Sequence, residues 1–181
     1  VVRLYAEAFS PNSPRWMQGS KELVQTESED DVVVGLSDHI RESLVSEHQL
    51  IIWGSGGTLR AIGENNGFEL TTLGIDATMG SEQVGTDLDE SGILSILSSH
   101  DGPTTLLLSP MGGQGFLIGR GNLQLSPTVL ESIGIDNILG VLTPAKLLTV
   151  RKLRIETGDE GLDERFASMR YMKVLQGYRT T

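Results

Sequence analysis

The chain of 181 residues has a length that suits one domain, and its composition excludes several kinds of site and partner. It has no cysteine, so it offers no disulfide, thiol nucleophile or cysteine-based zinc site, and its 3 histidines show no metal-ligand spacing. The formal charge of −10 argues against nucleic acid and anionic membranes as partners. No apolar run reaches the length of a membrane span and no signal peptide is visible, so we expect a soluble, cytoplasmic protein.

The predicted elements alternate between strands and helices along the chain. Residues 1–10 are predicted as a strand and residues 11–27 as a loop, after which Ser28 caps a helix that continues to about residue 48. A fully apolar strand at 50–53 follows. The predicted order then continues as helix 59–66, strand 71–76, helix 90–97, strand 104–108, helix 127–133, strand 137–142, helix 144–148, strand 153–156 and strand 171–175.

Strands that are apolar throughout and alternate with helices are typical of a parallel sheet that is covered on both faces. We therefore predict one α/β domain over residues 1–181, with a three-layer, Rossmann-like and mostly parallel sheet and helices on both faces. Residues 28–181 would form this core, and residues 1–27 a strand and loop extension. The strand-like start indicates that a segment upstream is missing, and trimming of disordered residues is the alternative.

The first glycine-rich segment is Gly54-Ser55-Gly56-Gly57-Thr58, between the strand at 50–53 and a helix. Backbone N–H groups at such a turn, together with the helix N-terminus, bind anions, and the hydroxyls of Ser55 and Thr58 add donors. The segment lacks the Gly-Lys-Ser/Thr ending of a P-loop. It therefore predicts a phosphate-binding turn, with an ordinary strand–helix turn as the alternative.

The second segment, residues 109–122, contains five glycines and directly follows the strand at 104–108. Such a density of glycine suits a backbone that approaches a ligand closely or takes a positive φ angle. The guanidinium of Arg120 can pair bidentately with a phosphate or carboxylate, and Gln114 and Asn122 can contact a base or ribose edge. A β-bulged hairpin with a structural arginine is the alternative. The ligand-binding candidates here are Gly112, Gly113, Gln114, Gly115, Arg120 and Asn122.

Three acidic residues are candidates for catalysis or metal binding. Asp76, at the end of a predicted strand, could hold a ribose hydroxyl, a metal-bound water or a proton, or it could simply cap a helix or turn. Asp159 and Asp163 lie four residues apart near a glycine and could coordinate Mg²⁺, with a solvated turn as the alternative. Lys21 and Lys146 are further candidate phosphate partners, with surface positions as the alternative. No Ser-His-Asp or Cys-His arrangement is evident.

The run SPMGGQGFLIGRGNLQLSPTVLESIGIDNILGVLTPAKL, at 109–147, strongly resembles a known family. This is the family of predicted ATP- or polyphosphate-dependent NAD kinases related to the acetoin-catabolism X protein, which carries a TPIGGQGF-FGRGNQQ-SP run and an NI-V-ATP-KL run. The family's R-DTGD--LD run corresponds to residues 153–163 here. Its MQG-K, GPGTT and LLGVD runs correspond to 17–21, 54–58 and 72–76, so the resemblance extends over nearly the whole chain.

The resemblance implies phosphoryl transfer from ATP or polyphosphate to NAD, with Mg²⁺, to give NADP. It implies that the two glycine segments cradle phosphates, that Arg120 neutralises charge, that Asn122 orients a sugar or base, and that Asp76 or Asp159 holds Mg²⁺. NAD kinases carry a Gly-Gly-Asp-Gly-Thr run in an upstream domain, and its aspartate is the assumed general base. This sequence lacks that run. We therefore expect the C-terminal domain of a longer protein, inactive alone, that binds a nucleotide or phosphorylated small molecule.

Two other functions stay open on the sequence. The alternation of strand, glycine turn and helix is also similar to the ribose-5-phosphate isomerase and glucosamine-phosphate deaminase group, which binds sugar phosphates. A sugar-phosphate enzyme complete within this domain would need a general base, for which Asp76 and Asp159 are the candidates. The third possibility is a non-catalytic regulatory or dimerisation module, which would form a homo-oligomer through a large apolar interface.

Overall fold

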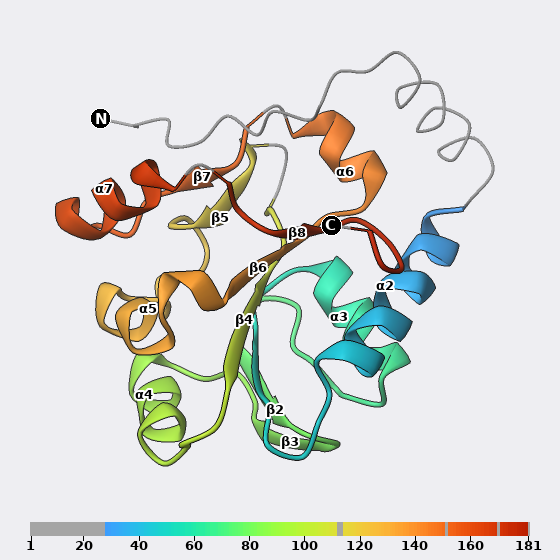
Figure 1. The fold of residues 1–181 in the computed structure, drawn as a ribbon, viewed down its shortest axis with the longest axis horizontal. Helices are drawn as coiled ribbons and strands as arrows, with labels where there is room; N and C mark the ends of the chain where they lie inside the picture. The colour runs from blue at the N-terminus through green and yellow to red at the C-terminus, as the bar shows by residue number, and fades with distance from the viewer. Residues whose placement is uncertain (1–27, 112–113, 151, 170, 181) are drawn as a thin grey trace.

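The computed structural model describes residues 28–111, 114–150, 152–169 and 171–180. A six-stranded sheet in the order β3-β2-β1-β4-β6-β8 forms its centre (Figure 1). The parallel strands are β1 (Leu50–Trp53), β4 (Thr104–Leu108), β6 (Ile138–Val141) and β8 (Val174–Leu175). The antiparallel strands beside β1 are β2 (Asp76–Met79) and β3 (Glu82–Gly85). The mostly parallel sheet confirms the predicted fold class.

Successive residues of β1 point to opposite faces of the sheet, so the core has two halves. Leu50 and Ile52 pack into one apolar cluster, and Ile51 and Trp53 pack into the other. The first cluster is covered by α4 (Glu90–Ser98), α5 (Pro127–Ile133) and α7 (Glu160–Ser168). The second is covered by α2 (Glu29–Ser43) and α3 (Gly57–Asn65). Figure 1 shows α2 and α3 on the side of the sheet opposite α4 and α5, which is the predicted three-layer arrangement.

The remaining elements follow β4 in the chain. They are β5 (Phe116–Ile118), the 3-10 helix η2 (Ile135–Asn137), α6 (Pro144–Thr149) and β7 (Arg154–Ile155). β5 and β7 pair in parallel as a separate two-stranded sheet. No helix in the described ranges is both long and apolar enough to cross a membrane.

Side-chain caps define where several helices begin. The hydroxyls of Ser28, Ser126 and Thr143 each accept a hydrogen bond from a backbone N–H in the first turn of α2, α5 and α6. Ser28 and Asp31 form a reciprocal capping box. Pro127 opens α5 just after its cap, where its missing N–H costs nothing. The predicted starts of these three helices are therefore confirmed.

The prediction of a strand over 71–76 is wrong, because the strand begins at Asp76 and the preceding residues form a loop. The apolar residues of this segment do not share one environment, because Leu73 is 80% exposed while Ile75 is buried in the core. β3, β5 and α7 were not predicted. The strand predicted at residues 1–10 and the loop at 11–27 lie outside the described residues.

Candidate functional site

Three polar segments meet at the carboxyl edge of the sheet because β1, β4 and β6 are parallel neighbours. They are residues 54–58 after β1, residues 109–122 after β4 and residues 143–146 after β6. Asp76 lies at the same edge for a different reason, since β2 runs antiparallel to β1 and pairs Asp76 with Trp53. The topology therefore gathers most of the predicted site residues at one end of the sheet.

The first glycine turn presents open backbone. The Gly54 N–H donates to the Leu107 carbonyl at 2.8 Å and the Gly56 N–H to the Thr72 carbonyl at 2.8 Å, which fixes the turn against its neighbours. Gly56 has a φ angle of 129°, and a Cβ added at Gly56 or Gly57 would meet no heavy atom within 4 Å. Helix α3 then begins at Gly57 without a side-chain cap. The turn and the uncapped helix start therefore leave room for a ligand to approach the backbone.

Met111 connects this turn to the second glycine segment. The buried Ser55 hydroxyl lies 3.3 Å from the Met111 sulfur, and the Met111 N–H donates to the Phe116 carbonyl at 3.0 Å. A Cβ on Gly121 would lie 3.2 Å from the same sulfur. Because Met111 and Phe116 form an antiparallel bridge, this stretch shares a feature of the hairpin alternative. The two glycine segments therefore contact each other through one side chain.

Lys146 lies at the same edge, at the start of α6. Its Nζ donates to the hydroxyl of Ser109 at 3.1 Å, and Ser109 is only 3% exposed. The Thr143 hydroxyl accepts from the Lys146 backbone N–H and lies 3.4 Å from a carboxylate oxygen of Glu29. Burial lowers the pKa of Lys146, and the negative charge of Glu29 partly offsets that effect. A half-buried ammonium group is therefore held next to the residue that follows β4.

The guanidinium groups of two arginines both lie near the ring of Phe116, the residue that pairs with Met111. The Cζ of Arg120 lies 5.9 Å and the Cζ of Arg154 5.4 Å from the centroid of the Phe116 ring. Arg120 is exposed, whereas Arg154 is half-buried. The Nε of Arg154 and Oε1 of Glu156 are buried and have no hydrogen-bond partner. Buried polar atoms without partners are rare, and these two leave one donor and one acceptor to be satisfied.

The other residues predicted in the second segment make contacts within it. Asn122 is 2% exposed, its Oδ1 accepts from the Gly119 N–H at 2.9 Å and its Nδ2 donates to the Leu117 carbonyl at 2.7 Å. Its amide therefore closes the loop between β5 and α5. Gly115 has a φ angle of 77°, and an added Cβ would lie 2.1 Å from the Lys152 carbonyl oxygen. Gln114 is exposed. The predicted residues Gly112, Gly113 and Lys21 lie outside the described residues.

Asp76 is 1% exposed and accepts three hydrogen bonds. The N–H and hydroxyl of Thr71 donate to its Oδ2 at 2.7 and 2.8 Å, and the Asp87 N–H donates to its Oδ1 at 3.0 Å. The carboxylate thus ties the loop before β2 to the turn after β3. Each oxygen of the side chain therefore accepts at least one hydrogen bond from the protein.

Asp159 and Asp163 also accept hydrogen bonds from their own segment. Asp159 caps α7 by accepting from the Leu162 N–H at 2.8 Å, and Asp163 accepts from the N–H and hydroxyl of Thr157 at 2.9 and 2.8 Å. In the described part of the chain, no group of three or more His, Cys, Asp or Glu side chains could hold a metal ion. The geometry of these two carboxylates therefore fits a helix cap and a closed turn.

Four residues of this edge were not predicted as candidates: Ser109, Met111, Arg154 and Glu156. Arg154 and Glu156 stand two apart on either side of the buried Ile155, so an extended backbone directs both to one side of β7. A pair of opposite charges on one face of a short strand is a pattern that the sequence alone displays, so these two residues could have been predicted as candidates. Ser109 and Met111 carried no such signal, because their significance depends on Lys146 and Ser55, which are distant in the sequence.

The fold and this edge define an α/β domain with a candidate anion-binding site at the carboxyl ends of its parallel strands. The family model for the ATP-NAD kinase C-terminal domain matches residues 17–181, which is most of the chain. The chain therefore belongs to the ATP-NAD kinase C-terminal domain family. No curated protein and no solved structure matches it.

Proposed function

We propose that this chain is the nucleotide-binding module of an NAD kinase-like phosphotransferase, in which ATP or polyphosphate phosphorylates NAD to NADP. The family supports the class of reaction. The proposed location of the binding site is supported by the contact between Ser55 and Met111, which joins the open glycine turn to the segment that contains Arg120. Together with Lys146 next to Ser109, it gathers backbone donors and cations at one edge of an otherwise acidic protein.

In this proposal, the phosphates bind at the start of α3. Phosphate oxygens would accept hydrogen bonds from N–H groups of Ser55, Gly57 and Thr58, with the positive end of the α3 dipole behind them. The open space around Gly57 supports this position. The ammonium of Lys146 and the guanidinium of Arg120 would neutralise the remaining charge, because both lie at the same edge.

Arg154 and Glu156 are proposed to bind the sugar or the carboxamide of the ligand. One unpaired donor and one unpaired acceptor suit a group that both accepts and donates, such as a ribose hydroxyl or a carboxamide. NAD carries groups of both kinds. Binding would satisfy two buried polar atoms at once, and a phosphate alone, which mainly accepts, would satisfy only Arg154.

The proposal gives the three predicted carboxylates, Asp76, Asp159 and Asp163, no part in the remaining chemistry. Phosphoryl transfer depends mostly on positioning and charge stabilisation, with a base or orienting group for the acceptor hydroxyl. Both oxygens of Asp76 are already bonded, and Asp159 and Asp163 bond their own segment, so no step of the proposal uses them as a base or as Mg²⁺ ligands. The resemblance assigns the base to the Gly-Gly-Asp-Gly-Thr run, which this sequence lacks. We therefore propose binding without turnover for this chain alone.

Calorimetric titration of this chain with NAD, NADP, ATP and ribose 5-phosphate, each with and without Mg²⁺, tests the proposal. We expect a nucleotide to bind, and Lys146→Met to weaken it about tenfold, or ~1.4 kcal/mol. Lys173→Met is the matched control, because it removes an equal charge from an exposed side chain just before β8. Absence of nucleotide binding, or equal effects of both variants, would contradict the proposal. Binding of ribose 5-phosphate alone would favour the sugar-phosphate alternative.

A turnover assay separates binding from catalysis. We expect no NADP from NAD with either ATP or polyphosphate in the presence of this chain alone. Formation of NADP would show that a base within these 181 residues is sufficient, and would contradict the proposed need for a second domain.

A further inference from the structure

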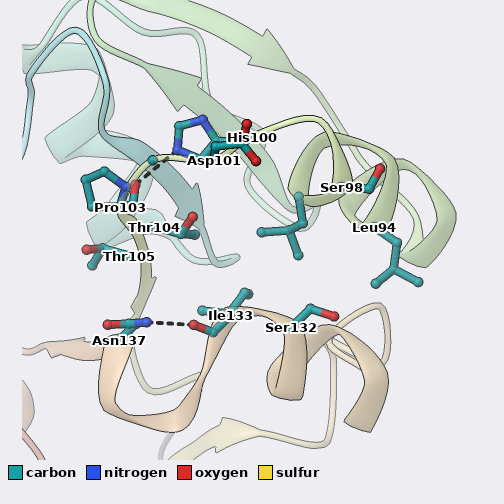
Figure 2. A pocket seen from close by; sticks show the side chains of 12 residues that line it. Leu94, Ser98, His100, Asp101, Pro103, Thr104, Thr105, Ser132, Ile133 and Asn137 are labelled. Carbon is teal, nitrogen blue, oxygen red and sulfur yellow. Dashed lines mark hydrogen bonds between the residues drawn. The ribbon is translucent and has the colours of Figure 1, made fainter.

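A cavity lies at the opposite, amino edge of the sheet, where β4 begins at Thr104. It has a volume of about 800 Å³ and lies between α4 and α5 (Figure 2). Its lining comes from the end of α4, the loop that leads into β4, the end of α5 and η2. It is therefore separate from the glycine turn and Lys146, which lie beyond the other ends of the parallel strands.

Three polar side chains in this cavity each donate one hydrogen bond to a backbone carbonyl. The Ser98 hydroxyl donates to the Ser95 carbonyl at 2.9 Å and the Ser132 hydroxyl to the Thr128 carbonyl at 2.8 Å. The Asn137 amide nitrogen donates to the carbonyl of Ile133 at 2.7 Å, as Figure 2 shows. The acceptors left to a ligand are two hydroxyl oxygens and the Asn137 Oδ1, and the Asn137 amide nitrogen keeps a second N–H.

His100 also uses a ring donor and keeps an acceptor. Its Nε2 lies 3.2 Å from the Pro103 carbonyl oxygen, and because a carbonyl only accepts, Nε2 carries the proton in this contact (Figure 2). In the neutral ring Nδ1 is then an acceptor. The ring lies so close to the loop that a Cβ at Gly102 would be 2.8 Å from its Cε1. Glycine at position 102 therefore leaves the space that the His100 ring occupies beside the cavity.

The electrostatic character of the cavity is negative. Asp101 lines it, makes no hydrogen bond within the described residues and is exposed. Helices α4 and α5 both end here, at Ser98 and Ile133, and the carbonyl end of a helix carries partial negative charge. No lysine or arginine is among the lining residues. Acceptors and negative charge thus coincide in this cavity. The hydroxyls of Thr104 and Thr105 can each accept or donate, and Thr105 already accepts from the Gln49 side-chain amide at 3.2 Å.

We propose that this cavity binds a small organic cation with several N–H donors, a primary amine or a guanidinium compound. Asp101 would pair with the cationic group, and Asn137 and the serine hydroxyls would accept its remaining N–H bonds. Leu94 and Leu97 on the α4 side would contact the carbon chain. Anions such as the nucleotides proposed for the other edge would be repelled. The site is independent of the proposed function because it shares no residue with it.

The test uses the whole chain and 1,4-diaminobutane as the probe, followed by NMR of the histidine ring protons at fixed pH and ionic strength. The chain has 3 histidines, and a His100→Gln variant assigns the His100 signals. We expect the His100 signals to shift saturably while those of His39 and His48 stay in place. Tetramethylammonium carries a charge without N–H donors, so it should cause no saturable shift. A saturable shift with both cations, or with neither, would overturn the proposal.

Two matched variants test the role of Asp101. Asp101→Asn removes one charge from the cavity, and Asp136→Asn removes one from an exposed position on η2 that does not line it. We expect the first to weaken diaminobutane binding tenfold or more and the second to change it less than twofold. Equal losses of affinity would show an effect of the protein's net charge alone and would overturn the proposal. Asp101 is exposed and without a hydrogen bond, so its variant should fold, which far-UV circular dichroism checks.

Discussion

The two glycine-rich segments look alike in sequence but use their glycines differently. In the first, Cβ atoms added at Gly56 and Gly57 would meet nothing within 4 Å, so the backbone faces open space. In the second, Cβ atoms at Gly115 and Gly119 would lie 2.1 and 3.1 Å from backbone oxygens of neighbouring residues. The first segment therefore leaves space beside its backbone at Gly56 and Gly57, while these glycines of the second allow β5 to pack closely against β7 and Glu156.

This difference shows that glycine density alone does not identify a ligand-binding loop. A glycine is required either where another group must approach the backbone or where the chain approaches itself. The space around each Cβ position distinguishes the two causes. The comparison predicts that substitutions at Gly115 and Gly119 mainly affect stability, and that a substitution at Gly57 mainly affects binding.

The largest effect is expected for Gly115→Ala. The new Cβ would lie 2.1 Å from the Lys152 carbonyl oxygen at a φ angle of 77°, so β5 and β7 would have to separate. We expect a loss of about 3–5 kcal/mol in the free energy of unfolding, measured by urea denaturation. Gly158→Ala is the control, because its φ angle is 84° but nothing lies within 4 Å, and it should cost only about 1–2 kcal/mol. Equal costs would contradict the role of Gly115 in close packing.

A smaller loss of stability is expected for Asp76→Asn. The substitution removes the charge from a buried carboxylate that accepts three hydrogen bonds, and one oxygen becomes a donor facing other donors. We expect a loss of about 2–3 kcal/mol in the free energy of unfolding. The exposed Asp136→Asn should change it by less than about 0.5 kcal/mol. Unchanged stability of the Asp76→Asn protein would contradict this structural role of the carboxylate.

Ligand binding through Lys146 should depend on pH. Burial lowers the pKa of this group, so its ammonium loses the proton at a lower pH than the usual value of about 10.4. The affinity for ATP should fall about tenfold as the pH rises through this lowered pKa, because only the charged form binds phosphate. Lys146→Arg should remove the fall, since arginine stays protonated. An identical pH profile of the two proteins would exclude Lys146 from the site.

The same shift predicts the opposite trend for stability. The folded state disfavours the charged form of Lys146, so between the folded and unfolded pKa values the unfolded chain binds more protons. The free energy of unfolding should therefore rise with pH across this window and level off above it. In Lys146→Arg, chemical denaturation at several alkaline pH values should show this rise to be missing.

The smallest effect on stability is expected for Gly57→Ala, which sharpens the comparison of the two segments. The new methyl group has room, so the free energy of unfolding should change by less than about 1 kcal/mol. Nucleotide binding should nevertheless weaken at least tenfold, because the methyl would occupy the space of the phosphate. Gly161→Ala, in the first turn of α7, is the matched control and should bind normally. Unchanged binding by Gly57→Ala would place the ligand elsewhere.

The elements that sequence predicted well are those whose signal is local. The apolar runs of β1, β4 and β6 and the serine and threonine caps specify their own structure. β3 was not predicted because it is a polar edge strand without a buried residue, and α7 because only Leu162 and Phe166 of its nine residues are buried. The two-residue strand β7 was predicted, but its partner β5 lies far away in the sequence.

For the candidate site, the sequence predicted positions better than roles. The topology brings the first glycine turn and Lys146 together as parallel strands require, and it also places Asp76 at that edge. The sequence did not show that the Asp76 and Asn122 side chains are occupied by neighbouring backbone groups. It also did not show that Arg154 and Glu156 each retain an unpartnered buried atom, because that depends on packing against Phe116 and Gly119.

The most direct test of the central claim is a two-dimensional NMR titration of the ¹⁵N-labelled chain with ATP and with NAD. The amide signals of Ser55, Gly57 and Thr58 should shift saturably, together with the side-chain Nε–H of Arg154 when NAD is the ligand. The amides that line the opposite cavity, such as Gly102 and Asn137, should remain in place. Saturable shifts confined to that cavity, or unchanged amide signals at the glycine turn with both nucleotides, would contradict the account.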